Sequence, residues 1–329
     1  MSEEWKQRRA VELHKYLVDG SYYFGDEKRM IYKDEQRLHP VVSAKMTTMN
    51  ESLEITGEGE KQFHGSILWF SSNGDCKIFS ADEVLTVSCS RDTYDRKVAN
   101  TAHFSQYFRT PPIIARNAKQ RTIVEPYIEP TLHTQPHKKD TIDTILTDYA
   151  NYFTSIKGDA RFTRQTMNEL LNRSGNRIHQ RLFEQTAALI DQSLFDTNFP
   201  YIPLHGDLWT DNLLITEDRA GEKEVWYIDY DTSGQYVFFY DFFKFMWNEF
   251  DVNNDNSSVM AYLHGEYDEY FVRVFRVFDL NYDPTLRASY FCYFFLNYML
   301  DETSMLPFEV KRGEMIDFER KLLPRLVAE

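Results

Sequence analysis

Three oxygen-bearing side chains on a strand–turn–strand pattern constrain this chain more than any other feature. An apolar run at 201–204 leads into an H-G-D triplet that ends in Asp207, and Asn212 opens a second apolar run. After a polar stretch with one glycine, the apolar run 225–228 leads to Asp229. Short apolar runs bounded by turn residues are typical of β-strands. We therefore expect a strand, an exposed turn and a hairpin that brings Asn212 and Asp229 side by side.

These residue types suit the transfer of a γ-phosphoryl group to a hydroxyl, which asks for positioning and charge neutralisation rather than covalent chemistry. A carboxylate such as Asp207 can accept the proton of the hydroxyl, while Asn212 and Asp229 offer the oxygen ligands that hard divalent cations prefer. An H-G-D turn alone also arises by chance, as a tight turn whose Asp caps a helix. The added amide and second acid favour the catalytic interpretation.

The full pattern, H-G-D, four residues, N, a hairpin and I-D-x-D, resembles the aminoglycoside phosphotransferase and choline kinase superfamily, which has the protein-kinase-like fold. Gly206 and Tyr230 stand where the protein-kinase motifs H-R-D and D-F-G have Arg and Phe, which favours the small-molecule branch. The resemblance implies that Asp207 is the catalytic base and that His205 braces the loop.

The same resemblance implies that Asn212 and Asp229 hold magnesium. Asp231 is either a contributor to the surroundings of the metal or an exposed loop carboxylate. Asp241 resembles the acid that opens the next helix and ties down the loop. The implied fold class is α+β and bilobal, with a small antiparallel-sheet lobe and a larger, mainly helical lobe. We expect residues 1–128, including an amphipathic helix at 1–17, to form the first lobe and residues 129–329 to form the second.

The first lobe should grip a nucleotide. Strands are expected at 53–56, 66–71 and 76–79, with an Asn-Gly hairpin before the last of them. Lys77 then lies on the third strand, where a kinase-like fold keeps the lysine that reaches the phosphates; the alternative is an ordinary surface lysine. Gly57 and Gly59 provide either a phosphate-binding loop or a solvated turn, because acidic neighbours suit a triphosphate poorly.

The segment after Lys77 departs from the family pattern. A further strand at 84–87 precedes the helix predicted at 93–108, which Asp92 or Thr93 caps. The acids considered as partners of the lysine are Asp95 and, upstream, Glu83, and neither is an obvious match. The glutamate partner of the lysine is therefore not identified.

The first lobe is expected to end in a hairpin formed by residues 113–114 and 122–125. The residues that follow resemble the hinge at which adenine is bound. The Glu125 carbonyl and the Tyr127 N–H are the expected adenine contacts, with an ordinary strand exit as the alternative.

The second half of the chain reads as helical after a polar linker at 130–139. Apolar residues recur at three- and four-residue intervals in four stretches. These are 140–152, 163–195 with a break at Gly175, 261–279 and 286–300. We expect the aromatic runs at 236–247 and 290–298 to be core rather than binding surface.

Composition excludes several classes of protein. The 329 residues carry a net charge of −14, which argues against nucleic-acid or anionic-membrane binding. Three cysteines without a C-x-x-C spacing, Cys76, Cys89 and Cys292, predict buried reduced thiols and a cytoplasmic location. No apolar span of membrane length and no signal-peptide core is present.

The sequence thus predicts an ATP- and Mg²⁺-dependent phosphotransferase for a hydroxyl of a small molecule. Overall acidity and many aromatic residues favour a cationic acceptor such as an amino sugar or an amino alcohol. Three alternatives stay open: a sugar, a cell-surface glycan or a protein as acceptor; a catalytically silent nucleotide-binding scaffold; and a helical interaction protein. The choice between ATP and GTP and the oligomeric state are also open.

Overall fold

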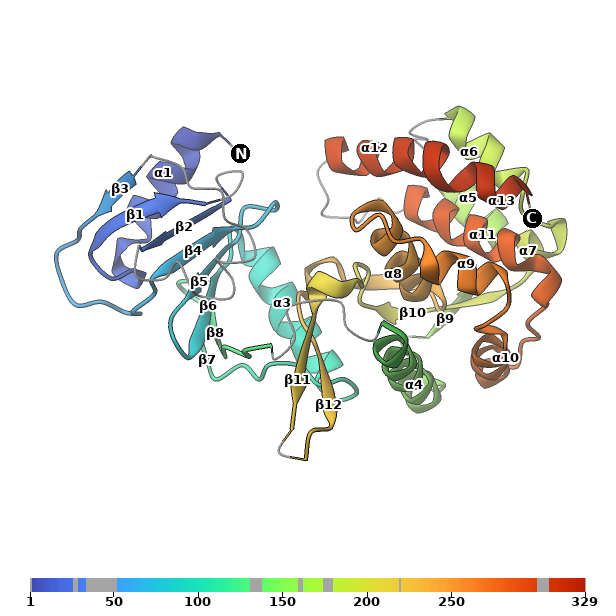
Figure 1. Ribbon diagram of the computed structural model, residues 1–329, viewed down its shortest axis with the longest axis horizontal. Coiled ribbons are helices and arrows are strands. Elements are labelled where there is room, and N and C mark those ends of the chain that lie inside the picture. Colours follow the sequence, from blue (N-terminus) through green and yellow to red (C-terminus); the bar gives the residue numbers. More distant parts are fainter. Residues whose placement is uncertain are drawn as a thin grey trace. The chain divides into compact units, whose positions relative to one another are not determined.

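The computed structural model describes residues 2–25, 29–33, 52–130, 138–158, 162–173, 180–218, 220–300 and 308–328. The chain forms two compact units. Unit 1 comprises Met1–His137 and Leu214–Ile228, and unit 2 comprises Lys138–Leu213 and Asp229–Glu329. The hairpin between the two expected metal ligands thus packs with the first part of the chain, although it interrupts the second part. Figure 1 shows the elements of each unit.

Unit 1 is built on an eight-stranded antiparallel sheet with the order β3-β1-β2-β4-β5-β6-β8-β7. Side chains on alternate positions point to opposite faces of such a sheet. Leu68, Ile78 and Leu85 lie on the face that packs against the amino-terminal helix. The strands are β1 (Gly20–Phe24), β2 (Met30–Lys33), β3 (Ser52–Ile55), β4 (Ile67–Phe70), β5 (Cys76–Phe79), β6 (Glu83–Val87), β7 (Ala115–Asn117) and β8 (Thr122–Pro126).

The amino-terminal segment completes the core of unit 1. Helix α1 (Glu3–Glu12) is capped by Ser2 and is followed by the short helix η1 (His14–Tyr16). Ala10, Leu13 and Leu17 are at most 3% exposed and belong to the same core cluster as the strand residues. The predicted helix is therefore present, though shorter than residues 1–17, and of the two alternatives, packing on the first lobe or loose attachment, the structure shows packing.

The strand positions expected in unit 1 need two corrections. β1 and β2, short aromatic runs among charged residues, precede the strands that the sequence indicated, so Lys77 lies on the fifth strand and not on the third. The glycine segment leaves β3 at the sheet edge and reaches β4 past two intervening strands, so it does not form a hairpin loop.

Two further elements of unit 1 differ in their bounds. Helix α3 (Arg91–Phe104) begins earlier than predicted because the Ser90 side chain, in a capping box with Thr93, accepts the Thr93 N–H. Residues 113–114 precede β7 instead of forming it. The hairpin β11 (Leu213–Glu217) and β12 (Lys223–Tyr227) is present as predicted.

Unit 2 is mainly helical and has one small sheet. Strand β10 (Phe199–Leu204) pairs with β13 (Gly234–Val237) and β9 (Thr163–Gln165). The helices are α4 (Lys138–Ile156), α5 (Met167–Arg173), α6 (Gln180–Ala187), α7 (Gln192–Asp196), α8 (Tyr240–Asp251), α9 (Ser257–Leu263), α10 (Asp268–Val277), α11 (Arg287–Leu300), α12 (Phe308–Asp317) and α13 (Leu323–Ala328).

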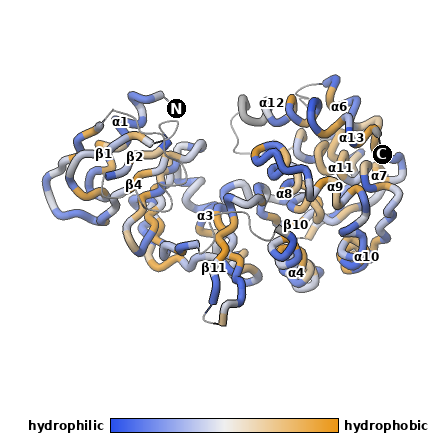
Figure 2. Tube along the Cα trace, viewed as in Figure 1, coloured by the Kyte–Doolittle hydropathy of each residue, from blue (hydrophilic) through white to orange (hydrophobic). Residues whose placement is uncertain are grey.

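Helices α8 and α11 form the aromatic core of unit 2. Every residue from Ser289 to Met299 on α11 is buried, and the same holds from Tyr240 to Phe250 on α8. Figure 2 shows apolar residues gathered along α11, in contrast to the hydrophilic residues along much of α10. The aromatic runs are core, as predicted, and they offer no exposed ring face for a cationic acceptor.

Some expectations for the second half are corrected. Residues 163–165 form β9 and not the start of a helix. Cys76 and Cys292 are buried free thiols, but Cys89 is exposed. Gly175 and most of the linker at 130–139 lie outside the described residues. The fold class, α+β with a sheet-rich unit and a mainly helical unit, is confirmed. Over the described residues, no helix is long and apolar enough to cross a membrane.

Candidate functional site

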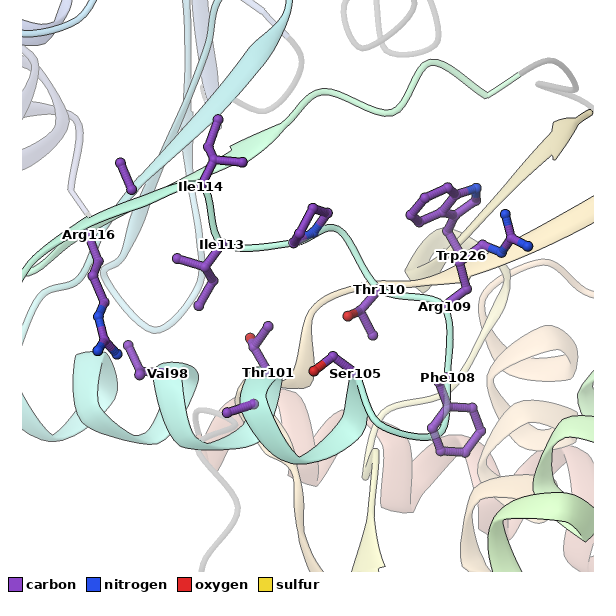
Figure 3. A pocket seen from close by; sticks show the side chains of 13 residues that line it. Val98, Thr101, Ser105, Phe108, Arg109, Thr110, Ile113, Ile114, Arg116 and Trp226 are labelled. Atoms are coloured by element: carbon purple, nitrogen blue, oxygen red, sulfur yellow. The ribbon is translucent and has the colours of Figure 1, made fainter.

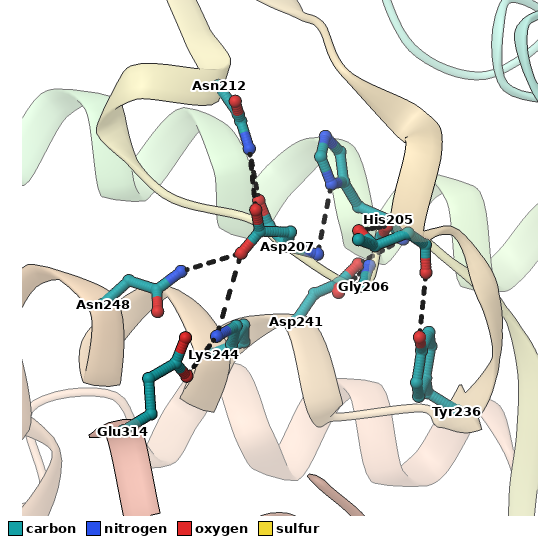
Figure 4. Close-up of polar contacts among 10 residues, drawn as sticks. His205, Gly206, Asp207, Asn212, Tyr236, Asp241, Lys244, Asn248 and Glu314 are labelled. Carbon is teal, nitrogen blue, oxygen red and sulfur yellow. Dashed lines mark hydrogen bonds and ion pairs between the residues drawn. The ribbon is translucent and has the colours of Figure 1, made fainter. Parts of the chain in front are cut away.

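The turn after β10 is held by a buried carboxylate from the first turn of α8. Asp241, 0% exposed, accepts the backbone N–H of His205 at 2.8 Å and that of Gly206 at 2.8 Å. The Tyr149 hydroxyl of α4 donates to the same carboxylate at 2.7 Å. Burial raises the pKa of Asp241, and the charge of His205 and these three donors oppose that rise. This arrangement fixes the direction in which the chain leaves β10 (Figure 4).

Gly206 is required by the backbone of this turn. Its φ of +83° lies in the left-handed region, and a Cβ added there would lie 2.4 Å from the Thr232 carbonyl oxygen. The Tyr236 hydroxyl donates to that same oxygen at 2.8 Å. The Thr232 hydroxyl donates to the His205 carbonyl at 3.3 Å, which holds the segment after Asp229 against the turn. His205 is 1% exposed, and the centre of its ring lies 4.7 Å from that of Tyr230 in the same segment, with the two rings tilted by 41°.

Replacing Gly206 with alanine should therefore destabilise the protein by more than the strain of a positive φ would, because the added Cβ also collides with the Thr232 carbonyl oxygen. We expect a loss of more than about 2 kcal/mol in the free energy of unfolding, read from urea titrations. Gly221 is the matched control, because its φ is +81° but an added Cβ meets nothing within 4 Å. Gly221→Ala should cost about 1 kcal/mol. Equal losses in the two variants would show that the contact with Thr232 does not matter.

Asp207 is surrounded by three nitrogen donors. Asn248 donates to Oδ1 at 3.2 Å, and the buried ammonium of Lys244 lies 3.8 Å from the same oxygen. Asn212 donates from Nδ2 to the Asp207 backbone carbonyl at 2.7 Å and to Oδ2 at 3.4 Å. The side chain keeps 28% of its surface exposed. Oδ2 is thus the less engaged carboxylate oxygen and the one that can accept a hydroxyl proton.

The charge of Asp207 is set by burial and by two neighbours. Burial raises the pKa of this carboxyl, Lys244 lowers it and Glu314 of α12 raises it. Lys244, 1% exposed, donates to Glu314 at 3.1 Å and lies 4.8 Å from the centre of the Tyr298 ring. Its pKa is raised, because the two carboxylates outweigh the opposing effect of burial. Lys244 therefore stays charged and shares its charge between Asp207 and Glu314.

The expected metal ligands lie on either side of the hairpin that follows this turn. Asn212, 8% exposed, turns its amide nitrogen toward Asp207, which leaves the carbonyl oxygen Oδ1 facing away from that residue. Asp229 lies two residues after the end of β12 and adopts a left-handed conformation, with φ of +67°. Asp231 lies in the short helix η5 (Tyr230–Thr232) and is neither fully buried nor fully exposed, so both interpretations of it remain.

The sequence interpretation identified Asp241 but missed the other polar residues of α8. Asp241, Lys244 and Asn248 lie on one side of that helix, at spacings of three and four residues. Glu249, 0% exposed, accepts the Thr210 N–H at 3.0 Å and the Thr210 hydroxyl, so it holds the loop that carries Asn212. Polar residues at helical spacing inside an aromatic run were the signal that could have found them.

The lysine expected at the nucleotide lies on an interior strand of unit 1. On β5, Lys77 stands opposite Trp69 of β4 and Thr86 of β6, so the three side chains share one face of the sheet. Asp95, one of the two acids considered as its partner, instead forms an ion pair with Arg91 at 2.7 Å. The intervening strand that the sequence indicated is β6.

Two of the expected nucleotide contacts are occupied by structural interactions. The Tyr127 N–H donates to the Asp82 carbonyl at 2.7 Å, so its assignment as an adenine donor is wrong. A Cβ at Gly57 would lie 2.0 Å from the His14 ring, so close packing against His14 is enough to explain why this position is a glycine. Gly59, with φ of +100°, has open space around it. Glu125 lies on β8 opposite Val84, and its carbonyl stays a predicted contact.

The comparisons agree with the chemistry of the turn. The sequence model of the phosphotransferase enzyme family (APH) matches residues 144–275, which include the H-G-D turn, both expected metal ligands and α8. The match confirms the predicted resemblance and the predicted enzyme class, a phosphotransferase. No curated protein sequence matches the chain.

Several solved structures resemble the chain at low identity. Choline kinase LicA from Streptococcus pneumoniae has a TM-score of 0.47 and 14% identity, covering 77% of this chain and 88% of that one. The GDP and kanamycin complex of APH(2")-IIia has a TM-score of 0.47 and 13% identity, covering 77% and 90%. Macrolide 2'-phosphotransferase MphH from Brachybacterium faecium has a TM-score of 0.44 and 13% identity, covering 76% of this chain and 87% of that one.

Proposed function

We propose that this chain, in which residues 144–275 match the phosphotransferase enzyme family, transfers the γ-phosphoryl group of ATP to a hydroxyl of a small molecule in the presence of Mg²⁺. The observation that carries the proposal is the setting of Asp207. Its carboxylate is partly exposed, faces Lys244 and Asn248, and lies at the end of a turn that Asp241 holds in place.

In this proposal the acceptor hydroxyl donates to Asp207 Oδ2 and passes its proton there as the new O–P bond forms and the bond to the leaving nucleoside diphosphate breaks. Lys244 stabilises the carboxylate before the proton arrives. Asn212 holds the loop through its bond to the Asp207 carbonyl, and His205 braces the turn from behind.

The donor set fits a magnesium site completed by the nucleotide. Asn212 Oδ1 and the Asp229 carboxylate would hold the ion, with Asp231 as a further candidate, and all three are hard oxygen donors. Among the described residues no group of three His, Cys, Asp or Glu side chains could hold a metal by itself. Mg²⁺ is commonly bound by one or two carboxylates, phosphate oxygens and water, so such a cage is not needed. The ion, when bound, neutralises charge on the phosphates.

For the nucleotide, we propose that Lys77 contacts the phosphates and that the Glu125 carbonyl contacts the base. Gly57 and Gly59 are weaker candidates, because Gly57 already packs on His14.

The test is a coupled assay for nucleoside diphosphate, with ³¹P NMR to identify the phosphorylated product. ATP and GTP, each with and without Mg²⁺, would be combined with aminoglycosides, amino alcohols and neutral sugars. We expect metal-dependent turnover with at least one acceptor. Activity confined to neutral sugars would exclude a cationic acceptor, and nucleotide binding without any turnover would support a silent scaffold.

The charges around Asp207 predict opposite shifts in the pH dependence of two variants. Lys244→Met removes a cation that lowers the pKa of Asp207, so the acid limb of the kcat profile should move to higher pH. Glu314→Gln removes a carboxylate that raises this pKa, and Lys244 then has Asp207 as its one carboxylate partner in this cluster. The acid limb should therefore move to lower pH. The profile of kcat against pH is the measurement.

Glu319→Gln is the control, because it removes one carboxylate from the next helical segment, where no contact with Asp207 is recorded. Its profile should match that of the unchanged protein. Shifts of the same sign in the Lys244 and Glu314 variants would mean that Asp207 does not set the acid limb.

A further inference from the structure

Unit 1 contains a pocket of about 810 Å³ whose lining residues all lie outside the proposed catalytic turn. It lies between the carboxyl-terminal half of α3 and the segment 109–116, and Trp226 of β12 closes one end. Figure 3 shows Arg116 at the opposite end, with the hydroxyls of Thr101, Ser105 and Thr110 between them. Its volume falls in the range of pockets that bind small molecules, about 300–1,000 Å³.

The hydroxyl of Thr110 indicates that the pocket is suited to a polar ligand group. Thr110 is only 9% exposed, and its Oγ1 is buried with no hydrogen-bond partner among the described residues. A buried hydroxyl without a partner is unfavourable by comparison with one that is hydrogen-bonded. Since Thr110 lines the pocket, a ligand with an oxygen acceptor can supply the missing partner.

The charges of the lining are of one sign. Arg109 and Arg116 are its charged members, and none of the thirteen lining residues is acidic. Arg109 forms an ion pair with Glu224 and lies 5.2 Å from the centre of the Trp226 ring, so it serves to hold the hairpin. Arg116 is exposed, and within the described part of the chain no ion pair is recorded for it. Arg116 is thus the cation that can meet a ligand anion.

The rest of the lining is apolar and partly uncovered. Phe108, Pro112, Ile113 and Trp226 provide aromatic and aliphatic surface, and Ile114 is 52% exposed. Few large apolar side chains in the described residues are exposed to this degree. The pocket therefore combines an apolar wall, a buried hydroxyl and one uncompensated guanidinium.

We propose that this pocket binds a small organic carboxylate with an aromatic body. The carboxylate pairs with Arg116, the ring lies against Trp226 and Ile113, and an ether or carbonyl oxygen accepts the Thr110 hydroxyl. The pocket is walled by β12, which ends two residues before Asp229, and by α3. None of the lining residues belongs to the turn that carries Asp207, and the test does not depend on catalytic turnover.

The test is ¹⁹F NMR of the full chain labelled with 5-fluorotryptophan, in which Trp226→Phe identifies the Trp226 resonance. The probe is 2-naphthoxyacetate, and 2-naphthoxyethanol is its neutral counterpart. We expect the acetate to move the Trp226 resonance with a Kd of about 1 mM or tighter, and the alcohol to bind at least about tenfold more weakly.

Two variants assign the contacts. Arg116→Gln should remove the preference for the acetate, and Thr110→Val should weaken both compounds about fivefold while the protein stays folded. Arg96→Gln, a substitution elsewhere on α3, should leave both affinities unchanged, because Arg96 does not line the pocket. A Trp226 resonance that neither compound moves, equal affinity for the two compounds, or a preference that survives Arg116→Gln would each overturn the proposal.

Discussion

Replacing Asp207 with asparagine should lower kcat by a factor of about 10²–10⁴, while the affinity for nucleotide changes little. Asparagine keeps the shape of the side chain, and its one carbonyl oxygen can still accept from either Asn248 or Asn212, but it cannot take the hydroxyl proton. The charge of Lys244 would then be balanced by Glu314 alone. The measurement is kcat from the coupled assay, with nucleotide binding followed separately by calorimetry.

Asp211→Asn is the matched control, since Asp211 is an exposed carboxylate in the same loop. It should keep kcat within about threefold of the unchanged protein. A comparable loss of kcat in both variants would show that activity depends on the overall charge of the loop rather than on proton acceptance at Asp207. A fully active Asp207→Asn would remove the base from the proposed mechanism.

The turn that carries Asp207 could be predicted because its determinants are local in sequence. The strand before it, the glycine that its backbone needs and the hairpin after it all lie between Phe199 and Tyr227, within short apolar runs and turn residues. Local patterns of this kind identify strands and turns well.

The order of strands in unit 1 could not be predicted in the same way. β3 is adjacent to β4 in sequence but pairs with β1 at the sheet edge. Such pairing depends on which faces of the strands are buried together. β1 has five residues and β2 has four, which is too short a pattern to predict their partners. The strand number of Lys77 was wrong for this reason.

The ion pair near Asp207 was missed for a different physical reason. Lys244 is surrounded by aromatic residues in sequence, so its helix was interpreted as core alone. A buried lysine is stable there because Glu314, 70 residues further along the chain, and Asp207 both face it. Partners that distant leave no local pattern, although a lone lysine in an apolar helix predicts that some partner exists.

The second large effect should come from Asp241, whose role is structural. Asp241→Asn should lower the free energy of unfolding by about 3 kcal/mol, measured by urea titration. The carboxylate accepts from His205 and Tyr149 on one oxygen and from Gly206 on the other. Asparagine has only one acceptor oxygen, so its NH₂ group must face a buried donor that then loses its partner.

Tyr149→Phe provides the graded comparison, because it removes one of the three donors and leaves both backbone bonds in place. It should cost about 1 kcal/mol. Asp191→Asn, a change of the same kind at the exposed cap of α7, should have a smaller effect than either. If Asp241→Asn were no worse than Tyr149→Phe, the two backbone bonds would contribute little. The turn that presents Asp207 would then have to be held by the packing of Gly206 against Thr232 instead.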